Sequence, residues 1–202
     1  MSPLNCKGII LEWMLRAFHP EASRINSAGL SGKDWVLLVK KAQKTGLNSR
    51  LIEMLNTSNH SGNIPPQILS SLTTARILAI QRNLMLLDEY RIISEKLNNH
   101  DLPHQSIKGL WILQHPELQG MSRITSDIDL LIPPENIGKT IDIIRMLGYQ
   151  QNPIRSRFDS ALNLQTGHHL TPFRNNNISL EIHYRALPGS SEIYNNELVQ
   201  MS

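Results

Sequence analysis

The run Ser126-Asp127-Ile128-Asp129-Leu130-Leu131-Ile132 decides what to expect of this chain. It is short and aliphatic, and it carries two acids two positions apart, which predicts a β-strand. Because side chains alternate across a strand, Asp127 and Asp129 share one face, while the aliphatic residues between and after them face a core. Neighbouring carboxylates repel each other unless a cation or proton lies between them, and carboxylate oxygens suit magnesium or manganese. The run therefore predicts a metal-binding strand; the alternative is a solvated edge strand.

Composition limits the class of protein. The chain has 202 residues and a hydrophobic fraction of 40%, enough for one or two domains with a sizeable core. The net charge of +3 is too weak to indicate a nucleic acid partner. Cys6 is the single cysteine and has no visible histidine partner, so it is interpreted as a bystander in a reducing compartment. The apolar run at residues 8–11 is too short for a signal peptide or membrane span. We therefore expect a cytoplasmic protein with no membrane partner.

Residues 1–98 are predicted to form an all-helical N-terminal region without evident chemistry. Helices are expected over residues 8–18, 33–44 (capped by Ser31), 47–55 and from the Pro65-Pro66 pair to about residue 97. The last helix carries two apolar stripes, which predict packing on two sides. One stripe is Ile77, Ile80, Leu84 and Leu87, and the other is Leu86, Tyr90, Ile93 and Leu97.

Residues 99–187 are predicted to form an α+β core, a mixed sheet flanked by helices. The pattern indicates an extended segment at 104–108, a short helix at 109–114, the acidic strand, a helix from 134 to 147, a brief strand at 149–151, and a hairpin of strands 168–173 and 178–184. Gly148 is the expected helix stop. Residues 188–202 are interpreted as the start of a shortened C-terminal helical segment.

A third acid, Glu181, lies on a later predicted strand. If that strand neighbours the acidic strand, three carboxylates converge at one end of the sheet. Such a cluster can hold two divalent ions, which bridge the phosphates of a nucleoside triphosphate and activate an attacking hydroxyl. The run Ile107-Lys108-Gly109 at a strand-to-helix junction could bind a phosphate, with Lys108 as a point charge and Gly109 allowing close approach. The alternative is an ordinary turn with a surface lysine.

Three further features admit two interpretations each. Arg123 precedes the acids and either binds a phosphate or pairs with Asp127 or Glu181. Ser126 either caps the turn or hydrogen-bonds near the metals, and the first role fits better. The histidines His168, His169 and His183 could form a zinc site with Glu181, but no cysteine accompanies them and their spacing matches no standard zinc motif. We therefore expect His183 to pack or hydrogen-bond behind the acids.

Several motifs together resemble a known family. They are Lys108-Gly109-x-x-x-Leu113, Arg123-x-x-Ser126-Asp127-Ile128-Asp129-Leu130-Leu131-Ile132, Leu147-Gly148-Tyr149 and Leu180-Glu181-Ile182-His183-Tyr184. As a set they resemble the uncharacterised nucleotidyltransferase family, part of the DNA-polymerase-β-like nucleotidyltransferase superfamily. The resemblance is densest over residues 107–184. The superfamily usually shows a Gly-Ser pair at the turn, where this chain has Lys108-Gly109.

The resemblance implies a site and a reaction. Asp127 and Asp129 would bind Mg²⁺ (or Mn²⁺), with Glu181 as the third acid, and Lys108, Gly109, Arg123 and Ser126 would contact the nucleotide. A nucleoside triphosphate such as ATP would donate a nucleoside monophosphate to a hydroxyl or phosphate on a small molecule, peptide or protein, releasing pyrophosphate. Two alternatives stay open: a non-catalytic nucleotide-binding or helper protein that retains the fold, and a metal-dependent phosphohydrolase.

Overall fold

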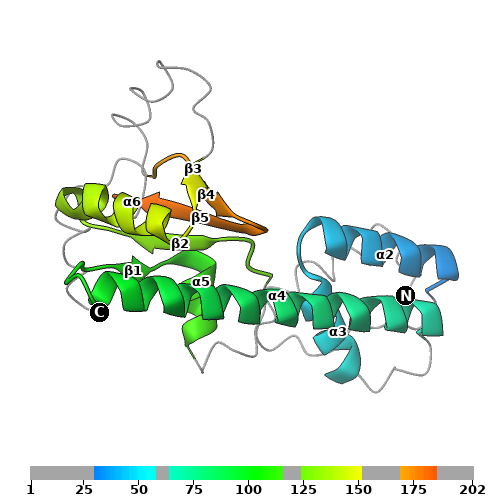
Figure 1. Ribbon diagram of the computed structural model, residues 1–202. Helices are drawn as coiled ribbons and strands as arrows, with labels where there is room; N and C mark the ends of the chain where they lie inside the picture. Colours follow the sequence, from blue (N-terminus) through cyan, green and yellow to red (C-terminus); the bar gives the residue numbers. More distant parts are fainter. Residues whose placement is uncertain (1–29, 58–63, 116–123, 152–168, 186–202) are drawn as a thin grey trace, which may run out of the picture. The chain divides into compact units, whose positions relative to one another are not determined.

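The computed structural model describes residues 30–57, 64–115, 124–151 and 169–185 (Figure 1). The chain divides into two compact units. One comprises residues 1–82 with 120–124, and the other comprises residues 83–119 with 125–202. Each unit is described by itself. The predicted helix at 8–18, Cys6 and the predicted segment at 188–202 lie outside the described residues.

Helices form the described part of the first unit. These are α2 (Gly32–Lys44), α3 (Asn48–Thr57) and the first half of α4 (Pro66–Asn98). Ser31 caps α2 as predicted, because its hydroxyl accepts from the backbone N–H of Asp34 while the Asp34 carboxylate accepts from the Ser31 N–H. The predicted apolar faces meet in one core, made of Trp35, Leu38, Val39, Ala42, Leu51, Ile52, Met54, Leu55, Ile64 and Leu72. That residues 1–98 are helical throughout stays a prediction.

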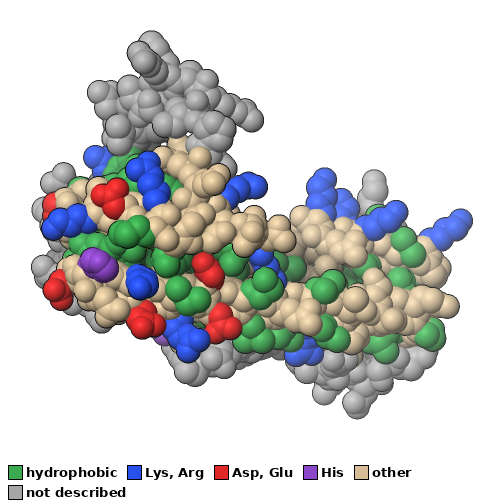
Figure 2. Space-filling view, in the orientation of Figure 1, with side chains coloured by type: hydrophobic (Ala, Val, Ile, Leu, Met, Phe, Trp, Pro, Cys, Tyr) green, Lys and Arg blue, Asp and Glu red, His purple; other side chains and the backbone are tan. Residues whose placement is uncertain are grey.

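The two apolar stripes of α4 have different environments. Leu86, Ile93 and Leu97 are fully buried, as predicted for the second stripe. The prediction for the first stripe was wrong, because Ile77, Ile80 and Leu84 are 51%, 45% and 57% exposed. Figure 2 shows such apolar side chains at the surface along this helix. Helical spacing predicts which residues share a face, but it does not specify what covers that face.

A five-stranded mixed sheet organises the second unit. Its strands are β1 (Gln105–Ser106), β2 (Ile128–Leu131), β3 (Gln150–Gln151), β4 (Phe173–Asn175) and β5 (Ile178–His183), in the order β1-β2-β5-β4-β3. Strand β2 runs parallel to β5, and the other three pairs are antiparallel. The prediction of an α+β fold with a mixed sheet is confirmed.

The hairpin boundaries differ from the prediction. The strand predicted at 168–173 is β4 at residues 173–175, preceded by a single bridge between His169 and His183, and His168 lies outside the described residues. The physical reason is the turn, which occupies only Asn176 and Asn177, with Asn176 in the left-handed region at φ 50°. A two-residue turn extends β4 to Arg174 and Asn175, which the sequence pattern predicted as loop, whereas β5 begins at Ile178 as predicted.

One hydrophobic core joins the sheet to three helices of this unit. They are the second half of α4, α5 (Lys108–Gln114) and α6 (Ile137–Met146), with the short 3₁₀ helix η3 (Pro134–Asn136) leading into α6. The core consists of Leu86, Ile93, Leu97, Leu102, Leu110, Ile128, Leu130, Ile132, Ile143, Ile144, Tyr149, Phe173, Leu180 and Ile182. Alternate residues of β2 and β5 thus face this core, and the residues between them face the other side of the sheet.

Tyr149 contributes a polar contact at the edge of this core. Its hydroxyl donates to Glu89 Oε1 at 2.8 Å, and burial together with this carboxylate raises the pKa of Tyr149. We expect Tyr149→Phe to lower the free energy of unfolding by about 1–2 kcal/mol, since the carboxylate loses a donor. Urea denaturation measures the change against Tyr90→Phe, which removes the same hydroxyl from a partly buried tyrosine of α4. Equal losses in the two variants would show that the Glu89 contact contributes nothing.

Candidate metal centre

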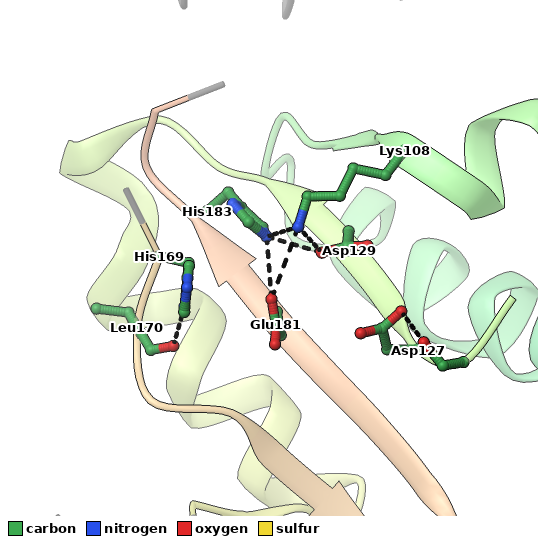
Figure 3. Close-up of polar contacts among 8 residues, drawn as sticks. Lys108, Asp127, Asp129, His169, Leu170, Glu181 and His183 are labelled. Carbon is green, nitrogen blue, oxygen red and sulfur yellow. Dashed lines mark hydrogen bonds and ion pairs between the residues drawn. The ribbon is translucent and has the colours of Figure 1, made fainter. Parts of the chain in front are cut away.

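The register between β2 and β5 brings the acids together. Asp129 lies directly opposite Glu181, and Leu131 lies opposite His183, in two parallel strands. Glu181 lies on a strand, as predicted, and that strand neighbours the acidic strand, which was the condition for the acids to converge. Asp129, Glu181 and His183 each offer a ligand atom, and these atoms all lie within 4.8 Å of one another (Figure 3).

Asp129 is the most enclosed acid of the cluster. Its side chain is only 3% exposed, and its Oδ1 accepts from Lys108 Nζ at 2.7 Å and from His183 Nε2 at 2.8 Å. Burial by itself raises the pKa of Asp129, but the bonds from His183 and Lys108 outweigh burial and hold the pKa below its usual value. Asp129 is therefore ionised at neutral pH.

Glu181 and His183 reinforce this arrangement. Glu181 Oε2 lies 3.5 Å from His183 Nε2 and 3.8 Å from Lys108 Nζ. The bond to His183 lowers the pKa of Glu181 against the opposing effect of burial. Burial favours neutral His183, yet its bonds to Asp129 and Glu181 raise its pKa. The two carboxylates thus share two nitrogen groups that can carry positive charge.

Asp127 stands at the margin of the cluster. It lies on the bend just before β2, is half-buried, and accepts a hydrogen bond from Ser126 Oγ at 2.9 Å. Burial raises the pKa of Asp127, and the negative charges of Asp129 and Glu181 raise it further. The ligand atoms that lie within 4.8 Å of one another come from Asp129, Glu181 and His183, and Asp127 is not in that group.

Lys108 points into the carboxylate cluster. Its backbone adopts the left-handed conformation with φ 56° at the first residue of α5, and its side chain is 45% exposed. The predicted phosphate contacts of Lys108, Gly109 and Ser126 stay predictions. Arg123 lies outside the described residues.

Comparison with known protein families identifies the family of this chain. Residues 31–201 match the sequence profile of a family described as uncharacterised nucleotidyltransferase. The chain belongs to this nucleotidyltransferase family. The resemblance seen in the sequence motifs is thereby confirmed, and family membership implies a nucleotide substrate. No curated protein and no solved structure matched the chain. Among the described residues, no helix has both the length and the apolarity needed to cross a membrane.

The donor atoms of the cluster fit a divalent cation. Nucleotidyltransferases generally use divalent metals, and the cluster offers two carboxylates and one imidazole nitrogen within 4.8 Å. A cationic group, the Lys108 ammonium, already bonds to Asp129. The same carboxylates therefore attract positive charge in the protein as it stands.

Sequence reasoning underestimated His183. Its hydrogen bond to Asp129 confirms the expected position behind the acids, but its Nε2 also belongs to the group of potential ligands. The available signal was its position two residues after Glu181, because residues i and i+2 of a strand share a face. His169 packs near the His183 ring, with 5.2 Å between ring centroids. The described group shares Glu181 and His183 with the zinc alternative, but its third member is Asp129.

Gly109 is needed for the packing of α5 against the segment before β2. A Cβ at this buried position would lie 2.9 Å from Thr125 Oγ1, where α5 meets the segment leading into β2. We expect Gly109→Ala to lower the free energy of unfolding by about 1–3 kcal/mol through overpacking. Thr125→Ala in the same chain removes the nearest atoms, so the double variant should lose less than the sum of the single losses.

Gly138 provides a matched control for that substitution. It lies exposed on α6, and a Cβ there meets nothing within 4 Å. Gly138→Ala should be neutral or stabilising, by up to about 1 kcal/mol, because alanine favours helix. Chemical denaturation of all four variants decides the matter. Strictly additive losses for Gly109→Ala and Thr125→Ala would contradict the packing role.

Proposed function

We propose that this protein transfers a nucleoside monophosphate from a nucleoside triphosphate to a hydroxyl or phosphate acceptor, with release of pyrophosphate. The observation that supports this best is the register of Asp129 against Glu181 on adjacent parallel strands, in a chain whose family is a nucleotidyltransferase family. Asp127, Asp129 and Glu181 are the proposed ligands of Mg²⁺ or Mn²⁺. The proposed finer fold is the polymerase-β-like core, over residues 99–187, behind a helical N-terminal region.

The proposed reaction is a displacement at the α-phosphorus. The acceptor oxygen forms a bond to that phosphorus, and the bond from phosphorus to the oxygen bridging the β-phosphate breaks, so that pyrophosphate leaves. When bound, the divalent ions neutralise phosphate charge and lower the pKa of the attacking hydroxyl. Asp129 is held ionised and in fixed orientation by His183, as a metal ligand requires.

The remaining residues have proposed supporting roles. One of the three acids, Asp127, Asp129 or Glu181, is also proposed to take the proton of the acceptor hydroxyl. Lys108 and Arg123 bind phosphate oxygens, and Gly109 and Ser126 line the nucleotide site. The acceptor is proposed to be a small molecule, peptide or protein rather than nucleic acid, since the net charge is only +3.

An assay with two radioactive labels tests the function. The protein is incubated with Mg²⁺ or Mn²⁺ and each nucleoside triphosphate, labelled at either the α- or the γ-phosphate, together with pools of sugars, peptides and proteins. Nucleotidyl transfer places the α-label on an acceptor and the γ-label in pyrophosphate. Free nucleoside monophosphate or inorganic phosphate without a labelled acceptor would identify a phosphohydrolase instead. Metal-dependent nucleotide binding by calorimetry without any product would identify a binding or helper protein.

A further inference from the structure

Lys108 supplies the cluster with a cation of its own. Its Nζ lies 2.7 Å from Asp129 Oδ1, 3.8 Å from Glu181 Oε2 and 3.3 Å from His183 Nε2. These are the side chains whose ligand atoms group within 4.8 Å. The ammonium therefore bonds to one of the two carboxylates that a divalent ion would use.

A divalent ion and the Lys108 ammonium would compete for the Asp129 carboxylate. Mg²⁺ binds a carboxylate oxygen at about 2.0–2.1 Å, so a bound ion and the Lys108 ammonium would be two positive groups repelling each other beside the Asp129 carboxylate. The ammonium is the group able to move, because it sits on a flexible four-carbon stem whose side chain is 45% exposed. Asp129 and His183 have side chains exposed by 3% and 0%. Metal entry therefore favours movement of Lys108 away from Asp129.

A displaced ammonium gains most from a new anion. A free divalent ion provides none, so its binding includes the full loss of the contact between Lys108 and Asp129. A metal ion that arrives with a triphosphate chain brings phosphate oxygens within reach of the tethered lysine, and these replace the lost carboxylate. The two ligands should then favour each other through Lys108.

We propose that Lys108 is a tethered counter-ion that opposes the binding of free divalent cations and exchanges its carboxylate partner for phosphate, thereby coupling metal binding to nucleotide binding. This inference rests on the proposed function for its metal site and its nucleotide. In this role, Lys108 would make the site bind the metal–nucleotide complex in preference to the free ion. Coupling between two ligands of this kind commonly amounts to about 5–150-fold in affinity.

The test compares two affinities in each variant. Electron paramagnetic resonance of free Mn²⁺ measures binding of the bare ion, and calorimetry measures binding of the Mn²⁺ complex of inorganic tripolyphosphate, which carries the phosphate chain without a base. Lys108→Met should bind bare Mn²⁺ about tenfold more tightly and the tripolyphosphate complex about tenfold more weakly than the original chain. A purely structural effect would move both affinities in the same direction.

Three variants serve as controls. Lys108→Arg keeps the charge and should stay within about threefold of the original chain for bare Mn²⁺. Lys139→Met makes the same charge change at an exposed position of α6 and should alter neither affinity. Asp129→Asn should abolish both. Circular dichroism confirms that each variant is folded.

The outcomes separate this inference from the proposed function. Bare-ion binding that Asp129→Asn abolishes but Lys108→Met leaves unchanged or weakens would overturn the counter-ion role and keep the metal site. Equal tightening of both affinities by Lys108→Met would overturn the coupling. Absence of Mn²⁺ binding in every variant would overturn both the counter-ion role and the proposed metal site. Opposite shifts without any labelled acceptor in the transfer assay would support Lys108 and refute nucleotidyl transfer.

Discussion

Asp129→Asn is expected to reduce transfer of α-labelled nucleotide by more than about 100-fold, the size of loss that even the outer partners of metal ligands can cause. Asparagine keeps the shape of the side chain and removes its charge. Asp129 is the acid that combines full burial with two hydrogen bonds that keep it ionised, so no water molecule or mobile side chain can take its place easily. Labelled product per unit of folded protein is the measurement.

The same variant should also be less stable without metal. Lys108 and His183 lose the carboxylate that pairs with them, which is expected to lower the free energy of unfolding by about 1–3 kcal/mol. Transfer must therefore be measured well below the melting temperature of the variant. Asp142→Asn, at an exposed position of α6, removes one negative charge from the same unit and should change neither property. Full transfer by folded Asp129→Asn would refute the proposed mechanism.

The convergence of the acids could be predicted because it depends on short-range rules. Alternation placed Asp129 on the face opposite Ile128 and Leu130, and the same rule applied to Glu181 between Leu180 and Ile182. Two strands that each have one aliphatic and one acidic face can pair in few ways, since a shift by one residue would turn the acids into the hydrophobic core. The parallel register of β2 and β5 follows this constraint.

The partner of Lys108 could not be predicted in the same way. It is separated from Asp129 by 21 positions and reaches it through a left-handed backbone, which lysine adopts rarely. The sequence pattern indicated a turn there, and a turn next to a glycine equally suits a phosphate or a surface lysine. The packing requirement for glycine at position 109 could not be predicted either, because Thr125 contacts this position only in the folded protein.

The exposed stripe of α4 marks another limit of sequence reasoning. Ile77, Ile80 and Leu84 follow helical spacing as closely as Leu86, Ile93 and Leu97, yet only the second set is buried. The spacing of apolar residues reflects the geometry of one helix, whereas their burial depends on which other element packs against that helix. Helix α4 has 33 residues and contributes to both compact units. It can therefore keep the apolar spacing over its whole length while being buried over only part of it.

Asp127→Asn is expected to lower transfer while raising stability, whereas Asp129→Asn should lower both. Transfer should fall by more than about tenfold, while the melting temperature of the metal-free protein should rise by about 1–2 °C. The pKa of Asp127 is raised by burial and by repulsion from Asp129 and Glu181, which outweigh the bond from Ser126. A raised pKa in the folded state means that the ionised carboxylate opposes folding at neutral pH, so a neutral amide relieves that repulsion.

Calorimetry in the presence of a chelator measures the stability, and the labelled-nucleotide assay measures transfer, with Asp142→Asn again as the charge control. The combination matters because a variant that loses activity by unfolding becomes less stable. An unchanged transfer rate in Asp127→Asn would remove Asp127 from the site and leave Asp129 and Glu181 as the acids of the candidate metal site. A more stable, inactive Asp127→Asn would mean that the protein keeps an unfavourable carboxylate because its metal or its acceptor needs it.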